Sequence, residues 1–170
     1  MDAEELRSFG IGTLSHAPMG GMVPGAVPEI QDKEIHLWLL PLALPPAEAG
    51  TLSALLSPEE HDRASRYTRV GLQLEYRNCR GYLRHILGKY TGIDPARIRF
   101  DYGASEKPSL GSEFDGPAFN VSQSGGWALI GVATSGQIGV DLEAIRRFDD
   151  FLVIAKNNFA PSEYDWLMQL

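Results

Sequence analysis

The sequence lacks the features on which several protein classes depend. Its single cysteine, Cys79, excludes a disulfide framework, and its four scattered histidines complete no zinc site. No apolar run approaches the ~20 residues of a membrane span, and the acidic start MDAEELRSFG is not typical of a signal peptide. The phosphate-binding glycine loop, the dinucleotide fingerprint, the nucleophile elbow and the paired-histidine zinc helix are absent. We therefore expect a cytoplasmic protein that binds no membrane.

The composition that remains is that of one ordinary globular domain. The 170 residues are 44% hydrophobic and 22% charged, so the chain can bury a core of its own. The formal net charge of −7 argues against a general nucleic-acid binder. Nine of the fifteen Lys and Arg residues nevertheless lie between residues 57 and 99. Such a basic segment is typical either of a solvated helix surface or of a site for a specific anion.

Two helices are predicted in this basic segment. Ser57, Pro58 and Glu60 form a helix start, with a capping serine, proline at the first position and glutamate at the third. This helix should run to about residue 67. Apolar residues at three- and four-residue steps predict a longer helix over residues 71–90 with one core-facing stripe. Three arginines, Arg77, Arg80 and Arg84, lie beside that stripe, where we expect their charged heads at the rim of a cleft.

The other segments are shorter and more polar. Residues 1–33 are rich in glycine and proline without apolar periodicity, which predicts a disordered tail. Strands are predicted at 34–41, 97–102, 118–121, 127–133 and 138–143, and short helices at 47–56, 151–158 and from 161 onward.

The predicted strand 138–143 carries the most informative residues. Because side chains alternate along a strand, Asp141 and Glu143 should share one face with Cα atoms about 6.5–7 Å apart. Two such carboxylates can hold one hard cation, and Mg²⁺ often combines one or two carboxylates with substrate phosphates. The alternative interpretation is an ordinary strand end whose acids face water.

Two further segments are compatible with phosphate binding. Residues 122–126, Ser-Gln-Ser-Gly-Gly, follow one strand and precede another, so they predict either a nest for phosphate or a tight hairpin. Lys107 precedes a proline, which favours an extended backbone. Its ammonium could point into a cleft or lie in solvent.

Taken in order, these segments resemble the 4′-phosphopantetheinyl transferases. The resemblance is to the monomeric, two-lobed type, named for surfactin synthetase activation, and covers about residues 35–170. It is carried by residues 57–60 with Arg63 and Arg66, by 107–110, by 119–125, by 139–143, and by Phe159 with Glu163 and Tyr164.

The resemblance implies both a fold and a reaction. The fold is α+β, with a mixed or antiparallel sheet packed on a long helix in a first lobe, residues 34–136, and the start of an incomplete second lobe, residues 137–170. The reaction is transfer of 4′-phosphopantetheine from coenzyme A to a serine of an apo acyl or peptidyl carrier protein, with release of adenosine 3′,5′-bisphosphate.

The resemblance also implies roles for individual residues. Asp141 and Glu143 would hold Mg²⁺ on the coenzyme A pyrophosphate and, with Lys107, form the catalytic set. Lys107, Ser122 and Gln123 would contact phosphate groups. The nucleotide end would be lined by Arg63, Arg66 and Arg84.

Three departures from the family pattern accompany this resemblance. Gln123 stands where a histidine is expected, and Glu106 replaces the glycine before Lys107. The family's W-x-x-K-E segment is not found, because Gln169 and Leu170 follow Trp166 at the corresponding spacing. We therefore expect weak or no transferase activity, and apolar faces of the second lobe that remain uncovered.

Two other functions fit the same residues. One is a non-catalytic remnant that binds coenzyme A or a carrier protein. The other is an α+β domain whose basic patch binds an unrelated phosphorylated metabolite.

Overall fold

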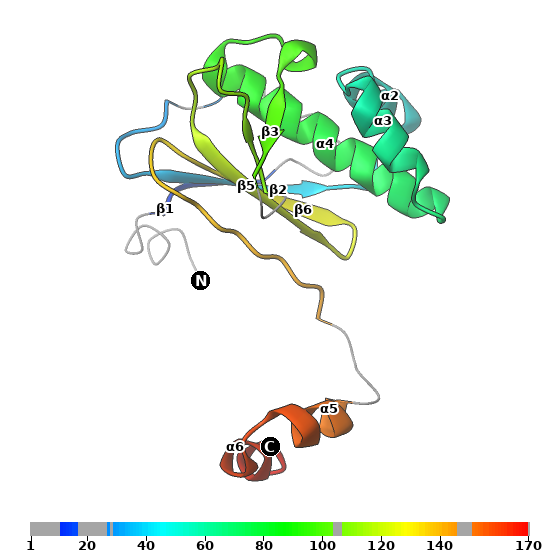
Figure 1. The fold of residues 1–170 in the computed structure, drawn as a ribbon, viewed down its shortest axis with the longest axis vertical. Helices are drawn as coiled ribbons and strands as arrows, with labels where there is room; N and C mark the ends of the chain where they lie inside the picture. The colour runs from blue at the N-terminus through cyan, green and yellow to red at the C-terminus, as the bar shows by residue number, and fades with distance from the viewer. Residues whose placement is uncertain (1–10, 17–26, 28, 104–106, 146–150, 170) are drawn as a thin grey trace.

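The fold is α+β and is built on a four-stranded mixed sheet (Figure 1). The computed structural model describes residues 11–16, 27, 29–103, 107–145 and 151–169. The sheet has the order β1-β2-β6-β5, in which β1 pairs with β2 in parallel and the other neighbours are antiparallel. Its strands are β1 (Ile11–His16), β2 (Ile35–Pro41), β5 (Ala118–Ser124) and β6 (Trp127–Ala133). Two short strands, β3 (Phe100–Tyr102) and β4 (Pro108–Leu110), form a separate antiparallel pair.

One long helix covers a single face of this sheet. The described helices are α2 (Pro46–Ser53), α3 (Pro58–Ser65), α4 (Val70–Thr91), the 3₁₀ turn η1 (Pro95–Arg97), α5 (Phe151–Asn158) and α6 (Pro161–Leu167). In Figure 1, α4 lies across the sheet, while α2 and α3 lie beside α4. The sheet packed on a long helix is the arrangement that the family resemblance implied for the first lobe.

The core lies between α4 and alternate residues of the sheet. Leu83, Ile86 and Leu87 of α4 are fully buried, as are Trp38 of β2 and Ile130 of β6. Burying large apolar side chains stabilises the fold by about 1.5–3 kcal/mol each, before the entropy cost of ordering them. The helix ends at Gly92, whose φ of 70° is the left-handed conformation that glycine adopts without strain.

Strand β5 presents different chemistry on its two faces. Gln123 shares a cross-strand row with Ala128 and Leu40, on the face that α4 covers. Ser122 shares the next row with Leu129 and Leu39, on the opposite face. The outer face of β5 is therefore polar, with Asn120, Ser122 and Ser124 at alternate positions.

The turn between β5 and β6 is a tight hairpin. Ser124 pairs with Trp127, and the two residues between them, Gly125 and Gly126, both have positive φ, at 60° and 79°. Two-residue hairpins with positive φ at both positions match the twist of antiparallel strands. Of the two predictions for residues 122–126, the structure has the hairpin.

Three predicted elements differ from the observed ones. Residues 1–33 were expected to form no regular structure, yet Ile11–His16 pairs with β2; most of the remaining predicted tail lies outside the described residues. The strand expected at 97–102 is shorter, because Pro95 fixes a backbone angle that begins the 3₁₀ turn η1. Residues 138–143 are extended but form no backbone ladder with a neighbour, so the strand predicted there is wrong.

Helices α5 and α6 expose apolar side chains. Phe151, Ile154 and Phe159 are each about half exposed, at 47%, 52% and 50%, while Leu167 is half-buried. These uncovered faces were predicted, whereas the second lobe itself stays a prediction. Among the described residues, no helix is both long enough and apolar enough to cross a membrane.

Candidate functional site

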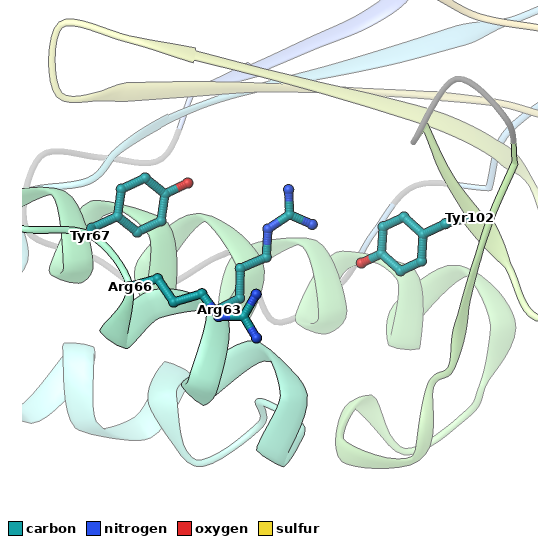
Figure 2. A pocket seen from close by; sticks show the side chains of 4 residues that line it. All are labelled: Arg63, Arg66, Tyr67 and Tyr102. Atoms are coloured by element: carbon teal, nitrogen blue, oxygen red, sulfur yellow. The ribbon is translucent and has the colours of Figure 1, made fainter.

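A basic pocket lies at the C-terminal half of α3 (Figure 2). Arg63 and Arg66 lie three residues apart, so they project from the same side of the helix. They line an open pocket of about 490 Å³ together with Tyr67 and Tyr102. Two guanidinium groups flanked by two aromatic rings can attract a phosphate and stack on a planar base. The structure thus brings together Arg63 and Arg66, two of the three residues that the resemblance implied for a nucleotide end.

The α3 helix is fixed to α4 by a buried carboxylate. Glu60 closes the predicted capping box, because the Ser57 hydroxyl accepts from the Glu60 amide and the Glu60 carboxylate accepts from the Ser57 amide. The same carboxylate accepts hydrogen bonds from Arg80 Nε at 2.7 Å and Arg84 Nε at 2.6 Å. All three side chains are buried. One acid therefore caps α3 and pairs with two arginines of α4.

This network reaches the basic pocket through Arg80. Arg80 Nη2 donates to the Tyr102 hydroxyl at 3.2 Å, and the Arg80 guanidinium lies 4.4 Å from the centre of the Phe100 ring. Tyr102 is a wall of the pocket. The buried ion pair thus positions both the helix that carries Arg63 and the tyrosine that faces it.

The predicted position of Arg84 needs a correction. The side chain was expected at the rim of a cleft, but it is 2% exposed, and Nη1 donates to the backbone carbonyls of Pro95 and Ile98 at 2.9 Å each. It lines a larger adjoining cleft of about 1130 Å³, but most of its donors are already used. Its position beside the apolar stripe reflects a buried partner, Glu60, which the helical pattern could not reveal.

Residues 138–144 lie on the outer face of β5 and β6. Ile138 and Val140 pack over Gly131, where an added methyl group would come within 2.6 Å of Val140 Cγ1. Three backbone amides of the segment donate to three side chains of β5. They are Val140 to Asn120 Oδ1, Leu142 to Ser122 Oγ and Ala144 to Ser124 Oγ, at 2.8, 3.0 and 3.1 Å. Side chains replace the backbone ladder, which explains why no strand forms.

The two predicted metal ligands point to these same serines. The Ser122 hydroxyl donates to Asp141 Oδ1 at 3.2 Å, and the Ser124 hydroxyl donates to Glu143 Oε2 at 3.1 Å. Both carboxylates are exposed, whereas Val140 and Leu142 are half-buried. Neither carboxylate forms an ion pair with a cation in the described part of the chain. Their hydrogen-bond donors in the described structure are thus neutral hydroxyl and amide groups.

Lys107 joins this region from the loop that leads into β4. Its Nζ donates to the backbone carbonyl of Ile138, the first residue of the carboxylate-bearing segment, and the side chain is half-buried. Lys107 therefore does not lie freely in solvent, and its ammonium group is already hydrogen-bonded within the protein. Gln123, by contrast, is exposed on the other face of β5 from Ser122. Glu106 lies outside the described residues.

Sequence reasoning missed two residues of this arrangement. Asn120 and Ser124 were not among the predicted site residues, although each bonds the segment as Ser122 does. Part of the signal was present in the sequence, since positions 120, 122 and 124 are all polar while 119 and 121 are apolar, although the polar Gln123 interrupts the alternation. Alternation of this kind indicates one face of a strand that meets polar groups.

The described residues can supply part of a divalent-cation site. Two carboxylates, Asp141 and Glu143, provide the oxygen donors that hard cations prefer, and Mg²⁺ commonly completes its coordination with phosphate oxygens and water. No group of three or more acidic, histidine or cysteine side chains suited to a metal occurs within the described ranges. The donor set therefore fits a cation that is shared with a phosphorylated ligand.

Comparison with known proteins gives consistent relatives. The chain is 41% identical over 139 residues to the 4′-phosphopantetheinyl transferase HetI of Nostoc sp., covering 81% of this chain and 59% of that protein. It is 38% identical over 136 residues to slr0495 of Synechocystis sp., provisionally named a 4′-phosphopantetheinyl transferase, covering 79% of this chain and 54% of that protein. The chain thus spans a little over half the length of these relatives. No protein-family model matches it.

Proposed function

This chain belongs to the 4′-phosphopantetheinyl transferase superfamily, and from that premise we propose that it acts on coenzyme A and an apo carrier protein. The proposed reaction moves 4′-phosphopantetheine from coenzyme A to a serine of an acyl or peptidyl carrier protein. The serine oxygen forms a new bond to phosphorus as the pyrophosphate P–O bond breaks, and adenosine 3′,5′-bisphosphate leaves. The predicted monomeric state and cytoplasmic location stay predictions.

The observation that carries this proposal is the pair of carboxylates on residues 138–144. Asp141 and Glu143 are exposed, project toward the same strand and are each held by a serine hydroxyl. We infer that they hold Mg²⁺ against the coenzyme A pyrophosphate. When bound, Mg²⁺ would neutralise charge that develops on the phosphate oxygens.

The basic residues support the same assignment. Arg63 and Arg66 line a pocket with Tyr67 and Tyr102, which suits the nucleotide end of coenzyme A. Lys107 lies at the start of the carboxylate segment, where a cation can meet a phosphate group. Phosphoryl transfer depends mainly on positioning and charge neutralisation, so these residues need no covalent nucleophile among them.

Arg84 and Gln123 take narrower roles in this proposal. Arg84 acts through Glu60 on the placement of α3, because its guanidinium is buried and already bonded. Gln123 donates a neutral hydrogen bond to phosphate where the family has a histidine that can carry charge. We therefore propose that phosphate binding by this chain is weaker than in family members with histidine at that position.

A loading assay tests the proposed reaction directly. The 170-residue chain is mixed with coenzyme A, Mg²⁺ and an apo carrier protein, and the mass of the carrier is followed. A mass increase equal to one phosphopantetheine, dependent on Mg²⁺, supports transfer. Calorimetry with coenzyme A and with adenosine nucleotides, each with and without Mg²⁺, measures binding separately.

A second candidate is binding without transfer. It is favoured by the donor set, since the described residues offer two carboxylates and no third metal-binding side chain nearby. Coenzyme A binding that is strengthened by Mg²⁺, together with no loading of the carrier, would support this candidate. Equal affinity for coenzyme A and simple nucleotides would contradict both functions.

A further inference from the structure

Three side chains of β5 replace a backbone ladder for the segment that carries the two carboxylates. Asn120, Ser122 and Ser124 each accept a hydrogen bond from the amide twenty residues further along the chain. The constant separation means that the segment runs parallel to β5. Every second amide of the segment donates to one side chain of β5. We call these three residues the side-chain ladder.

The two serines of the ladder do more than accept. Each hydroxyl takes an amide hydrogen bond and donates its own proton to the carboxylate of the preceding segment residue. Ser122 thus links the Leu142 amide to Asp141, and Ser124 links the Ala144 amide to Glu143. A hydroxyl has one proton to donate, so neither serine can donate to another group while it holds its carboxylate.

Packing on either side keeps the segment in this register. Ile138 and Val140 occupy the space over Gly131, which has no side chain to displace them. At the other end, Ala144 lies over Gly125, where an added methyl group would come within 2.8 Å of Ala144 Cβ. Apolar contacts thus locate both ends of the segment, and the ladder fixes its middle.

From this geometry we propose that Asn120, Ser122 and Ser124 are positioning residues that hold Asp141 and Glu143 toward one side for a divalent cation. The ladder is a property of the described fold alone, whereas its effect on cation binding rests on the proposed function. Ser122 would then serve the carboxylates through its hydroxyl, in contrast to the phosphate contact that the resemblance implied for it.

We expect the loss of each serine hydroxyl to affect its partner amide to a different extent. The Leu142 amide has a second acceptor, Asp141 Oδ1, at 3.0 Å, so removal of the Ser122 hydroxyl leaves that amide with a partner. The Ala144 amide has Ser124 Oγ as its acceptor among the described groups. Ser124→Ala should therefore expose the Ala144 amide more than Ser122→Ala exposes the Leu142 amide.

Amide hydrogen exchange of the full chain, followed by NMR without metal, tests the ladder. Loss of one hydrogen bond should speed exchange at Ala144 about tenfold in Ser124→Ala, and Ser124→Thr should restore the rate because it keeps the hydroxyl. Ser135→Ala is the matched control, since Ser135 is exposed and has no hydrogen bond in the described structure. The Ile130 amide in β6 checks that each variant is folded.

Four results would overturn the ladder. The first three are an Ala144 amide that exchanges without protection in the wild-type chain, an unchanged rate in Ser124→Ala, and an equal acceleration in Ser135→Ala. The fourth is failure of Ser124→Thr, which keeps the hydroxyl, to restore protection.

Titration of the same variants with Mg²⁺ tests the positioning role. We expect binding to weaken several-fold in Ser124→Ala and to recover in Ser124→Thr, at unchanged global stability. Equal affinity in wild type and Ser124→Ala would overturn the positioning role alone. A wild-type chain that binds no Mg²⁺ with coenzyme A present would overturn the proposed function, while the exchange rates still decide the ladder.

Discussion

The molecule holds its acidic groups in two opposite ways. Glu60 is 5% exposed and accepts from two arginines, which neutralise it inside the fold. Asp141 and Glu143 are exposed and are held by serine hydroxyls, which leave their negative charge in place. A carboxylate paired with arginines has little charge left to offer a ligand, whereas one held by neutral donors keeps it.

This difference separates a structural acid from acids suited to bind a cation. Burying a charge is costly unless it is paired, so the partners of Glu60 are a condition for its location. Exposed carboxylates need no such compensation, so the serines next to them serve orientation. This contrast predicts that removal of Glu60 changes stability, whereas neutralisation of Asp141 or Glu143 changes cation binding.

Removal of the buried acid should have the largest effect on stability. Glu60→Ala leaves Arg80 and Arg84 buried without their partner and removes a helix cap, which we expect to lower the free energy of unfolding by about 3–5 kcal/mol. Urea unfolding measures the loss. Glu59→Ala, on the same turn but exposed, is the control and should change stability by less than about 0.5 kcal/mol. A Glu60→Ala variant as stable as this control would contradict the contrast.

Neutralising the exposed acids should spare stability and remove cation binding. In Asp141→Asn the amide can keep the Ser122 hydrogen bond, so we expect stability within about 0.5 kcal/mol of wild type. Mg²⁺-dependent coenzyme A binding should weaken about tenfold or more, because a charged ligand is lost. Calorimetry with and without Mg²⁺ measures this. A destabilised variant with unchanged binding would reverse the assignment of the two acid types.

A buried histidine tests how the interior tolerates new charge. His36 is 1% exposed and lies 2.6 Å from the Tyr90 hydroxyl, which also accepts from Trp38 Nε1. Burial lowers the pKa of His36 below its usual 6.5, although nearby Glu34 opposes the shift. Burial also raises the pKa of Tyr90 to about 12, so that hydroxyl stays neutral.

The lowered pKa of His36 determines how the free energy of unfolding depends on pH. The stability that neutral His36 contributes is complete above the unfolded-state pKa of about 6.5 and is lost as pH falls toward the folded-state pKa. We expect the free energy of unfolding to fall on acidification and the slope to be shallower in His36→Asn. His85, whose pKa is also lowered by burial, should account for part of the remaining slope. Stability that rises below pH 6.5 would contradict this account.

The smallest expected effect is at Gln123. Gln123→His adds a group that is charged below about pH 6.5, and the exposed position limits the gain in coenzyme A affinity to about two- to fivefold. Calorimetry at about pH 6 and about pH 8 separates charge from shape, because only the charged imidazole should help. Equal gains at both pH values would point to a contact other than a charge.

Local signals predicted much of the fold. The capping box at Ser57 and Glu60 depends on neighbours in sequence and is confirmed, and the helix predicted over residues 71–90 is found at Val70–Thr91. The apolar stripe of α4 also holds, except that Leu72 in the first turn is 40% exposed. Periodicity shows which side of a helix faces the core, but not how far along the helix the core extends.

The sequence alone could not identify contacts between residues that lie far apart in the chain. The alternation of residues 138–143 predicted exposed acids and covered apolar residues, and the burial of those residues agrees. It could not show that β5 would present side chains in place of a backbone edge. In the same way, the spacing of Arg80 and Arg84 is equally compatible with a cleft and with a buried acid, since Glu60 lies on another helix.

The described contacts that hold the carboxylate segment do not involve its connection to β6, residues 134–137. The place of the segment is set by Gly131 and Gly125, which leave room for it, and by the polar residues of β5 that face it. We therefore expect that moderate insertions into this connection leave the acids in place. The same site could join this chain to a reporter domain with Asp141 and Glu143 kept in place.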